Sequence, residues 1–313
     1  MPFDILLINP VLPSLDRQLA ERYTLHRYYA HADKAGYLRE IGARIHGVVT
    51  GGASGIDNAT MDQLPNLKIV AINGIGTDAV DLDYARRRGL HVSTTPGVLT
   101  DDVADLALGL LLSACRGLCI GDRHVRDGQW GKAPALPLAR KFSGMRVGIV
   151  GLGRVGRAIA ARAAAFGCPI AYTDLRELSD VPYRFVTDLA QLAADSDALV
   201  LAASADNAEG IVDARVLDAL GPDGYLINVA RGKLVNEADL VRALADGRIA
   251  GAGLDVFVDE PNAPAELFGM PNVVLQPHRA SATVQTREAM GAIVLDSLAA
   301  SFAGRRPDTS VTP

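Results

Sequence analysis

Short apolar runs alternate with helix-like segments along the first hundred residues of the chain. The runs have the length and composition of buried strands, and residues 81–88 have the apolar spacing of a helix. Because strands that alternate with helices form parallel sheets, this pattern predicts a parallel α/β domain. The predicted strands are 5–8, 47–50, 67–72 and 90–93.

A second alternating series begins at Arg146 and predicts a second doubly wound sheet with right-handed crossovers. Its predicted strands are 147–150, 170–173, 198–202, 225–229, 252–256 and 273–276, and its clearest helices are 154–166 and 237–245. The fold class that we expect is therefore α/β, with two Rossmann-like doubly wound parallel-sheet domains and an active-site cleft between them.

Two further helix-like stretches set the predicted domain boundaries. From Asp101 to Cys119 apolar residues occur on every face of a helix, so we expect this helix to be buried. The stretch 284–302 has no strand of its own to pair with, and we expect it to pack on the first domain. The prediction is a discontinuous substrate domain, residues 1–100 and 284–313, and a dinucleotide-binding domain, residues 101–283.

Composition and charge narrow the class of protein. The 313 residues are 49% hydrophobic and 21% charged, which is typical of a globular chain long enough for two domains. The net charge of -5, without a run of Lys or Arg, argues against a nucleic-acid partner.

The spacing of Cys115, Cys119 and Cys168 fits neither a zinc site nor a disulfide framework, so we expect no metal site and three buried, reduced thiols.

The amino terminus shows no secretory signal. Residues 1–10 run directly into a strand pattern and lack the basic region and cleavage site of a signal peptide. The apolar stretch 103–119 is short for a bilayer and contains charged residues. We therefore expect a cytoplasmic protein that does not bind membranes.

Three spaced glycines follow the strand that opens the second series and begin its first helix. Gly151 permits the tight turn, Gly153 lets the backbone approach a pyrophosphate, and Gly156 allows close packing of helix on strand. Arg154 and Val155 lie in the first turn of the helix, where unpaired N–H groups and the positive dipole end favour an anion. This pattern predicts a bound dinucleotide.

An acidic residue ends the next strand. Asp174 lies eighteen residues past Gly156, where a carboxylate can accept hydrogen bonds from the hydroxyls of the adenosine ribose. Asp174 therefore favours NAD. Arg176 leaves NADP open, because a guanidinium can bind a 2′-phosphate instead. The expected cofactor is NAD or NADP.

Three residues whose side chains can bind a carboxylate or transfer a proton each follow a later strand of the second series. Arg231, Glu260 and His278 should meet beyond the carboxyl ends of these strands, where parallel sheets bind ligands. The planar fork of Arg231 can grip a carboxylate, and His278 can donate a proton to a developing alkoxide. A carboxylate at Glu260 would favour the protonated imidazole. Asp255 can hydrogen-bond the nicotinamide carboxamide.

Each of these residues also has a structural interpretation when it is considered alone. Arg231 could be a surface arginine that precedes a helix, Glu260 a turn acid next to a proline, and His278 a loop histidine after a proline. Their joint placement after successive strands favours a hydride-transfer site for a 2-keto acid.

At these residues the chain resembles the NAD(P)-dependent D-2-hydroxyacid dehydrogenases, in the branch of the glyoxylate/hydroxypyruvate reductases and plant hydroxyphenylpyruvate reductases. The resemblance rests on the runs VGIVGLGRVGRAIA, INVARGKLVNEADLV, GAGLDVFVDEP and LQPHRASAT. It implies that Arg231, Glu260 and His278 are catalytic and that Asp255 meets the nicotinamide. The implied activity is reduction of glyoxylate or hydroxypyruvate to the D-2-hydroxyacid.

The same resemblance implies substrate contacts and a homodimer. The segment 73–78 is similar to the family's glycine loop, in which backbone amides, here those of Ile75 and Gly76, bind the substrate carboxylate. The run LTDDVADLALGLLL resembles the helix used in dimerisation, and Trp130 resembles an aromatic residue that reaches the substrate site of a partner subunit.

Alternatives remain within and outside the enzyme class. The chain could act on hydroxyphenylpyruvate or phosphohydroxypyruvate, or it could be an NADH-sensing corepressor, since the same scaffold serves in both classes. It departs from the family at residues 202–206, where a proline-containing stretch is common, and at Arg279 and Ala280 after His278.

Overall fold

The computed structural model describes residues 3–204 and 208–313, so Ala205 and Asp206 of the departing loop lie outside the described residues. The chain folds into two compact units. The first unit comprises Met1–Leu99 and Ser281–Pro313, and the second comprises Thr100–Ala280.

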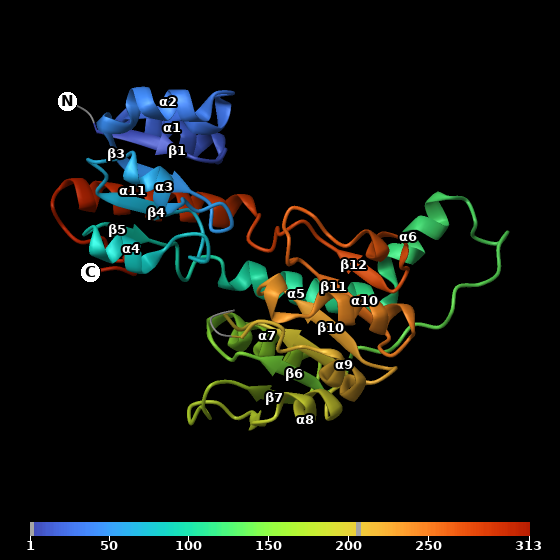
Figure 1. Cartoon of the computed structure of the whole chain (residues 1–313). Helices are drawn as coiled ribbons and strands as arrows, with labels where there is room; N and C mark the ends of the chain where they lie inside the picture. The colour runs from blue at the N-terminus through green and yellow to red at the C-terminus, as the bar shows by residue number, and fades with distance from the viewer. Residues whose placement is uncertain (1–2, 205–207) are drawn as a thin grey trace. The chain divides into compact units, whose positions relative to one another are not determined.

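The first unit is built on a five-stranded parallel sheet in the order β2-β1-β3-β4-β5. Figure 1 labels β1, β3, β4 and β5 of this sheet. Its strands are β1 (Asp4–Leu7), β2 (Thr24–Arg27), β3 (Ile45–Thr50), β4 (Ile69–Ile72) and β5 (His91–Ser93). The three central strands are almost entirely buried, which explains why they read as continuous apolar runs.

Helices cover both faces of this sheet. Leucines and valines of α1 (Pro13–Arg22) and α11 (Val284–Phe302) pack on one face. Helices α2 (Lys34–Ile41), α3 (Asn58–Asp62) and α4 (Leu82–Arg87) pack on the other, together with the short 3-10 helices η1 (Tyr28–Ala30) and η2 (Gly42–Arg44). The carboxyl-terminal helix thus belongs to the core of the first unit, which makes this unit discontinuous in sequence.

The second unit holds a seven-stranded parallel sheet in the order β12-β11-β10-β9-β6-β7-β8. Its strands are β6 (Val147–Val150), β7 (Ile170–Thr173), β8 (Arg184–Phe185), β9 (Ala198–Leu201), β10 (Tyr225–Asn228), β11 (Gly251–Leu254) and β12 (Val273–Leu275). The strand order reverses between β6 and β9, which is the topological switch point of a Rossmann sheet.

Two layers of helices enclose the second sheet. Helix α5 (Thr100–Arg116) contacts β10, β11 and α7 (Arg154–Ala165) on one face. On the other face lie α8 (Leu189–Ala194), α9 (Ala214–Leu220) and α10 (Glu237–Ala245), with η3 (Gly232–Leu234) and η4 (Ala265–Gly269) in the connections. Asp188, Asp213 and Asn236 cap the amino termini of α8, α9 and α10 with their side chains.

The long apolar helix ends earlier than its sequence suggests. Gly117 adopts a left-handed conformation, with φ of 62°, and separates α5 from α6 (Leu118–Arg126). The expectation of three buried cysteines is consequently wrong for Cys119, which is exposed on α6, whereas Cys115 and Cys168 are buried.

Within the described residues no single helix is long and apolar enough to cross a membrane, and α5 and α6 reach that length only as a pair bent by 62°.

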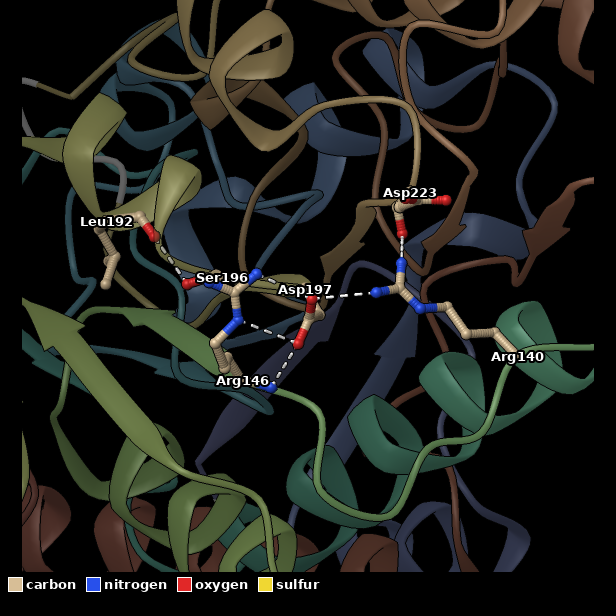
Figure 2. A network of polar contacts seen from close by, with 6 residues as sticks. All are labelled: Arg140, Arg146, Leu192, Ser196, Asp197 and Asp223. Carbon is tan, nitrogen blue, oxygen red and sulfur yellow. Dashed lines mark hydrogen bonds and ion pairs between the residues drawn. The ribbon is translucent and has the colours of Figure 1, made fainter.

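A mostly exposed segment, residues 127–139, follows α6, and we call it the arm. Its carboxyl-terminal end is fixed by Asp197, which accepts hydrogen bonds from Arg140 Nη2 at 3.0 Å and from the backbone and side chain of Arg146 (Figure 2). Arg140 also donates to the carbonyl of Asp223. These contacts attach the arm to the amino-terminal ends of β6, β9 and β10.

Candidate active site

The glycine turn lies at the switch point of the second sheet, between β6 and α7. Gly151 has a φ of 87°, and a Cβ atom there would lie 2.6 Å from the Cα of Ala203. A Cβ at Gly156 would lie 2.1 Å from the carbonyl oxygen of Gly151. Both positions therefore require glycine, and they bring the start of α7 close against the end of β6.

Gly153 differs from these two glycines because the space around it is open. Apart from its own chain neighbours, no heavy atom of the described residues lies within 4 Å of the position of its Cβ. The turn thus leaves room beside its backbone for a phosphate group, directly in front of the amino terminus of α7.

A pocket of about 550 Å³ opens beside the turn. Of the residues that the sequence predicts to bind the cofactor, Gly153, Arg154, Asp174 and Arg176 line it together. The remaining lining residues are Leu152, Arg157, Leu175 and Leu178. Val155 lies in the first turn of α7.

Asp174 is held in a fixed orientation at the end of β7. Its Oδ2 accepts a hydrogen bond from the Leu152 amide at 2.7 Å, and its Oδ1 accepts one from the Leu175 amide at 2.7 Å. A carboxylate, a glycine turn and a helix amino terminus in one pocket are the features that a dinucleotide requires, so the residues present fit this group.

His278 and Glu260 are in direct contact. His278 Nδ1 lies 2.6 Å from Glu260 Oε2, and the other oxygen of Glu260 accepts a hydrogen bond from the Phe257 amide at 3.0 Å. The His278 side chain is 42% exposed, while that of Glu260 is 22% exposed. The carboxylate therefore orients the imidazole and leaves its Nε2 edge for a ligand.

Arg231 lies close enough to act on this pair electrostatically. Burial alone would raise the pKa of Glu260, but hydrogen bonds from His278 and Phe257 lower it. The positive charges of His278 and Arg231 lower it further, and the net pKa is below the ordinary value of 4.5. Glu260 is thus ionised at neutral pH, and the structure brings Arg231, Glu260 and His278 together as the strand positions predict.

Asp255 fixes the backbone that presents His278. Its side chain is 0% exposed, and its two oxygens accept the amides of Arg279 and Ala280 at 2.8 and 2.9 Å. Its carbonyl accepts the His278 amide at 2.8 Å. Burial raises the pKa of Asp255, and the two amide hydrogen bonds oppose that shift. Its contact with a nicotinamide stays a prediction.

Sequence reasoning missed three residues that assemble this site. A Cβ at Gly232 would lie 2.0 Å from the carbonyl carbon of Phe257, so only glycine lets the Arg231 turn pack against the loop of Glu260. Asn228 donates from Nδ2 to the Arg231 carbonyl at 2.9 Å. Glu237 accepts the Val258 amide at 2.9 Å. The glycine directly after Arg231 is the one signal of this packing visible in the sequence.

The predicted substrate loop lies in the first unit, after β4. The Asn73 amide donates to the Thr50 carbonyl and the Thr95 amide to the Gly74 carbonyl, both at 2.8 Å, which fixes the loop at its start. Within the described part of the chain, the amides of Ile75 and Gly76 donate no hydrogen bond to a protein acceptor. They are therefore available to an anion.

Trp130 lies in the arm and is 80% exposed. Among the residues that the structure describes, no group of His, Cys, Asp and Glu side chains could hold a metal ion.

Comparison with known proteins identifies the family. The family model for the D-isomer specific 2-hydroxyacid dehydrogenase, NAD binding domain, matches residues 108–280. The 2-ketogluconate reductase of Gluconobacter oxydans is 44% identical over 311 residues, which are 99% of this chain and 98% of that protein. Glyoxylate/hydroxypyruvate reductase A of Arabidopsis thaliana is 45% identical over 302 residues, with 96% of each chain covered.

A solved structure extends this relation to the fold. The NADPH-dependent glyoxylate/hydroxypyruvate reductase of Sinorhizobium meliloti, in complex with NADP and malonate, superposes with a TM-score of 0.90 at 39% identity, covering 99% of this chain and 97% of that chain. The predicted fold class of two parallel-sheet α/β domains and the predicted enzyme class are confirmed. The chain belongs to the D-isomer specific 2-hydroxyacid dehydrogenase family, whose members are NAD(P)-dependent oxidoreductases.

Proposed function

We propose that this enzyme reduces glyoxylate and hydroxypyruvate to the corresponding D-2-hydroxyacids with NADH or NADPH. The observation that carries the proposal is the 2.6 Å contact between His278 and Glu260, with the charge of Arg231 acting on the same carboxylate. This triad supplies a proton donor and a cation, the two groups that reduction of a 2-keto acid requires from the protein. The names of the Arabidopsis and Sinorhizobium relatives support the choice of substrate.

The dinucleotide, when bound, supplies the hydride that adds to the keto carbon. Arg231 grips the substrate carboxylate through its planar fork, and the amides of Ile75 and Gly76 bind the same group. His278 donates the proton from Nε2 to the carbonyl oxygen as negative charge develops there. Its Nδ1 stays bonded to Glu260, whose ionised carboxylate fixes the orientation of the ring during transfer. Solvent then restores the proton to His278.

The two units divide these tasks in our proposal. Residues 1–100 and 284–313 form the substrate domain, because the amides of Ile75 and Gly76 lie there and donate to no protein acceptor among the described residues. Residues 101–283 form the dinucleotide-binding domain, since they contain the glycine turn and Asp174. Free thiols at Cys115, Cys119 and Cys168 support a reducing compartment, and the cytoplasm is the one that we propose.

We also propose that the protein is a homodimer. Apolar side chains are exposed along α6 and the arm, and exposed apolar patches mark sites of protein contact. These side chains are Leu118, Val125, Trp130, Leu136 and Leu138. The family resemblance supports a second copy of this chain as the partner, with Trp130 directed to the partner's substrate.

The test is a substrate panel followed by the absorbance of NADH and of NADPH. The panel contains glyoxylate, hydroxypyruvate, hydroxyphenylpyruvate, 3-phosphohydroxypyruvate and 2-ketogluconate, the last because of the Gluconobacter relative. We expect the highest kcat/KM with glyoxylate or hydroxypyruvate. Tight NADH binding without turnover of any keto acid would instead support a dinucleotide-sensing binding protein.

A further inference from the structure

The pocket beside the glycine turn contains an unusual balance of charge. Three arginines, Arg154, Arg157 and Arg176, line it together with one acid, Asp174. NADH and NADPH differ only at the adenosine ribose, which carries a 2′-hydroxyl in NADH and a 2′-phosphate dianion in NADPH. The placement of these side chains therefore decides which dinucleotide the pocket accepts.

Asp174 cannot turn away from the ribose position without breaking hydrogen bonds. Both of its oxygens accept backbone amides at 2.7 Å, from Leu152 and Leu175. Hydrogen bonds to a charged acceptor are about twice as strong as neutral ones. The negative charge therefore stays at the end of β7, where it would accept the hydroxyls of a bound ribose and repel a phosphate.

Arg157 is held by two contacts that direct its guanidinium. Its Nε donates to the Leu152 carbonyl at 3.2 Å, and its Nη2 donates to Asp180 Oδ1 at 2.9 Å. The hydrogen bond to Asp180 raises the pKa of Arg157, and the charge of Asp174 contributes in the same direction. Arg157 thus lies within electrostatic reach of the ribose acid but is bonded to a different carboxylate.

We propose that Asp180 is a specificity-determining positioning residue, because it holds Arg157 off the ribose 2′ position and so makes the pocket select NADH over NADPH. We call the pair Asp180 and Arg157 the latch. Without Asp180, the Arg157 guanidinium would be able to turn towards a 2′-phosphate, which Arg154 and Arg176 also face from the pocket wall. The latch rests on the proposed binding of a dinucleotide here, but not on the identity of the keto acid.

The side chains that form the latch are partly exposed, at 38% for Arg157 and 68% for Asp180. Exposed ion pairs contribute little to folding, so removing this one should leave the protein folded. Its effect on a ligand that carries a dianion is larger, because both the lost negative charge and the released guanidinium favour the phosphate.

The experiment measures nucleotide binding directly, without turnover. Wild type, Asp180→Asn, Arg157→Met and the double variant are titrated with NADH and NADPH by nucleotide fluorescence, and with AMP and adenosine 2′,5′-bisphosphate by calorimetry. The matched control is Asp218→Asn, which removes an acid from another Arg–Asp pair of the same unit, Arg248 Nη1 to Asp218 Oδ1 at 2.6 Å. Asp218 is not among the residues that line the pocket.

We expect wild type to bind NADH more tightly than NADPH, and Asp180→Asn to tighten NADPH by about three- to tenfold relative to NADH. Adenosine 2′,5′-bisphosphate should gain over AMP in the same proportion. Arg157→Met should leave the wild-type ratio unchanged and abolish the effect of Asp180→Asn in the double variant.

Three results would overturn the latch. The first is a wild-type preference for NADPH, and the second is an effect of Asp180→Asn no larger than that of Asp218→Asn. The third is weaker NADPH binding by Arg157→Met alone, because Arg157 would then already be a phosphate ligand in the wild type. An enzyme that shows the expected binding but reduces no keto acid would refute the proposed function and leave the latch standing.

Discussion

His278 has a backbone conformation that a histidine rarely adopts. Its φ is 48°, whereas side chains other than that of glycine favour negative φ. The conformation persists because its amide donates to the Asp255 carbonyl and its Nδ1 meets Glu260. Strain held in place by surrounding contacts is typical of functional sites and agrees with a role for His278 in proton transfer.

We expect His278→Ala to lower kcat by about 10²- to 10⁴-fold, because the variant has no proton donor for the alkoxide. Binding of NADH should change little, since the glycine turn and Asp174 are untouched. Steady-state kinetics and a fluorescence titration of NADH measure the two effects, with His91→Ala as the control. Equal losses in kcat and in NADH affinity would mean that His278 is structural.

The contribution of Glu260 to the free energy of unfolding should depend on pH. Its pKa is lower in the folded protein than in the unfolded chain, so the unfolded state binds more protons in the interval between the two values. The stability that Glu260 contributes is therefore present above its ordinary pKa of 4.5 and is lost as the pH falls through the lower folded value.

Urea unfolding of wild type and Glu260→Gln measures this contribution. The free energy of unfolding of the two proteins should differ most near neutral pH and converge in acid. A difference that stays constant or grows as the pH falls would show that the carboxylate of Glu260 is not stabilised by its neighbours.

The sequence predicts which candidate residues follow the strands, but it does not predict the contacts that place them. Arg231, Glu260 and His278 each follow an apolar strand, and this position is visible in the sequence. The support from Asn228 and the close approach at Gly232 depend on how two loops pack, and no periodic pattern reports that packing.

At the scale of elements, the central strands and the edge strands β5 and β12 could be predicted, whereas the edge strands β2 and β8 could not. The central strands are covered on both faces and read as apolar runs. Strand β2, with the sequence TLHR, lies at the edge of the first sheet and is only partly buried, and β8, at the edge of the second sheet, has two residues. Neither leaves a run of apolar residues long enough to recognise.

The connection between α5 and α6 shows a second limit of pattern reasoning. Apolar residues continue past Gly117, so the pattern predicts one helix to Cys119. The helix ends at Gly117 because this glycine takes a left-handed conformation, which glycine adopts at no steric cost.

The turn of Arg231 and the loop of Glu260 pack closely against each other at Gly232. Gly232→Ala should separate the turn of Arg231 from the loop of Glu260, because the added methyl group would overlap the Phe257 backbone. We expect a loss of about 1–3 kcal/mol in the free energy of unfolding and a loss of kcat, with NADH binding retained.

Gly121→Ala in α6 is the matched control, since no heavy atom of the described residues outside the neighbouring helix backbone lies within 4 Å of its Cβ position. Alanine there should be neutral or stabilising by up to about 1 kcal/mol. If Gly232→Ala is as well tolerated as the control in both stability and kcat, the contact between the two loops does not position Arg231.

At the scale of the whole molecule, the order of the strands in each sheet determines where the candidate catalytic and binding residues lie. Each sheet carries its chemistry in the loops after its strands, as open parallel sheets do. The alternation of strands and helices predicts this arrangement because parallel strands share one carboxyl edge. The exposure of the arm could not be predicted, because its glycines and prolines indicate a loop but not how much of that loop other parts of the chain cover.

The dimer proposal predicts that the arm controls assembly. Leu138 is fully exposed in the single chain, and a charge there would be buried against a partner at a high cost. Wild type should sediment as a dimer in analytical ultracentrifugation, and Leu138→Glu should shift towards monomer, unlike Phe268→Glu on η4. A wild-type protein that stays monomeric at every concentration would refute the proposal.

The most direct test of the central claim is the product of a single reaction. Hydroxypyruvate is incubated with the enzyme and reduced dinucleotide, and chiral chromatography identifies and quantifies the glycerate. We predict D-glycerate in an amount equal to the NAD(P)H consumed, and at least about a hundredfold less with His278→Ala over the same time. L-glycerate, or no glycerate from an enzyme that binds the dinucleotide, would contradict the account.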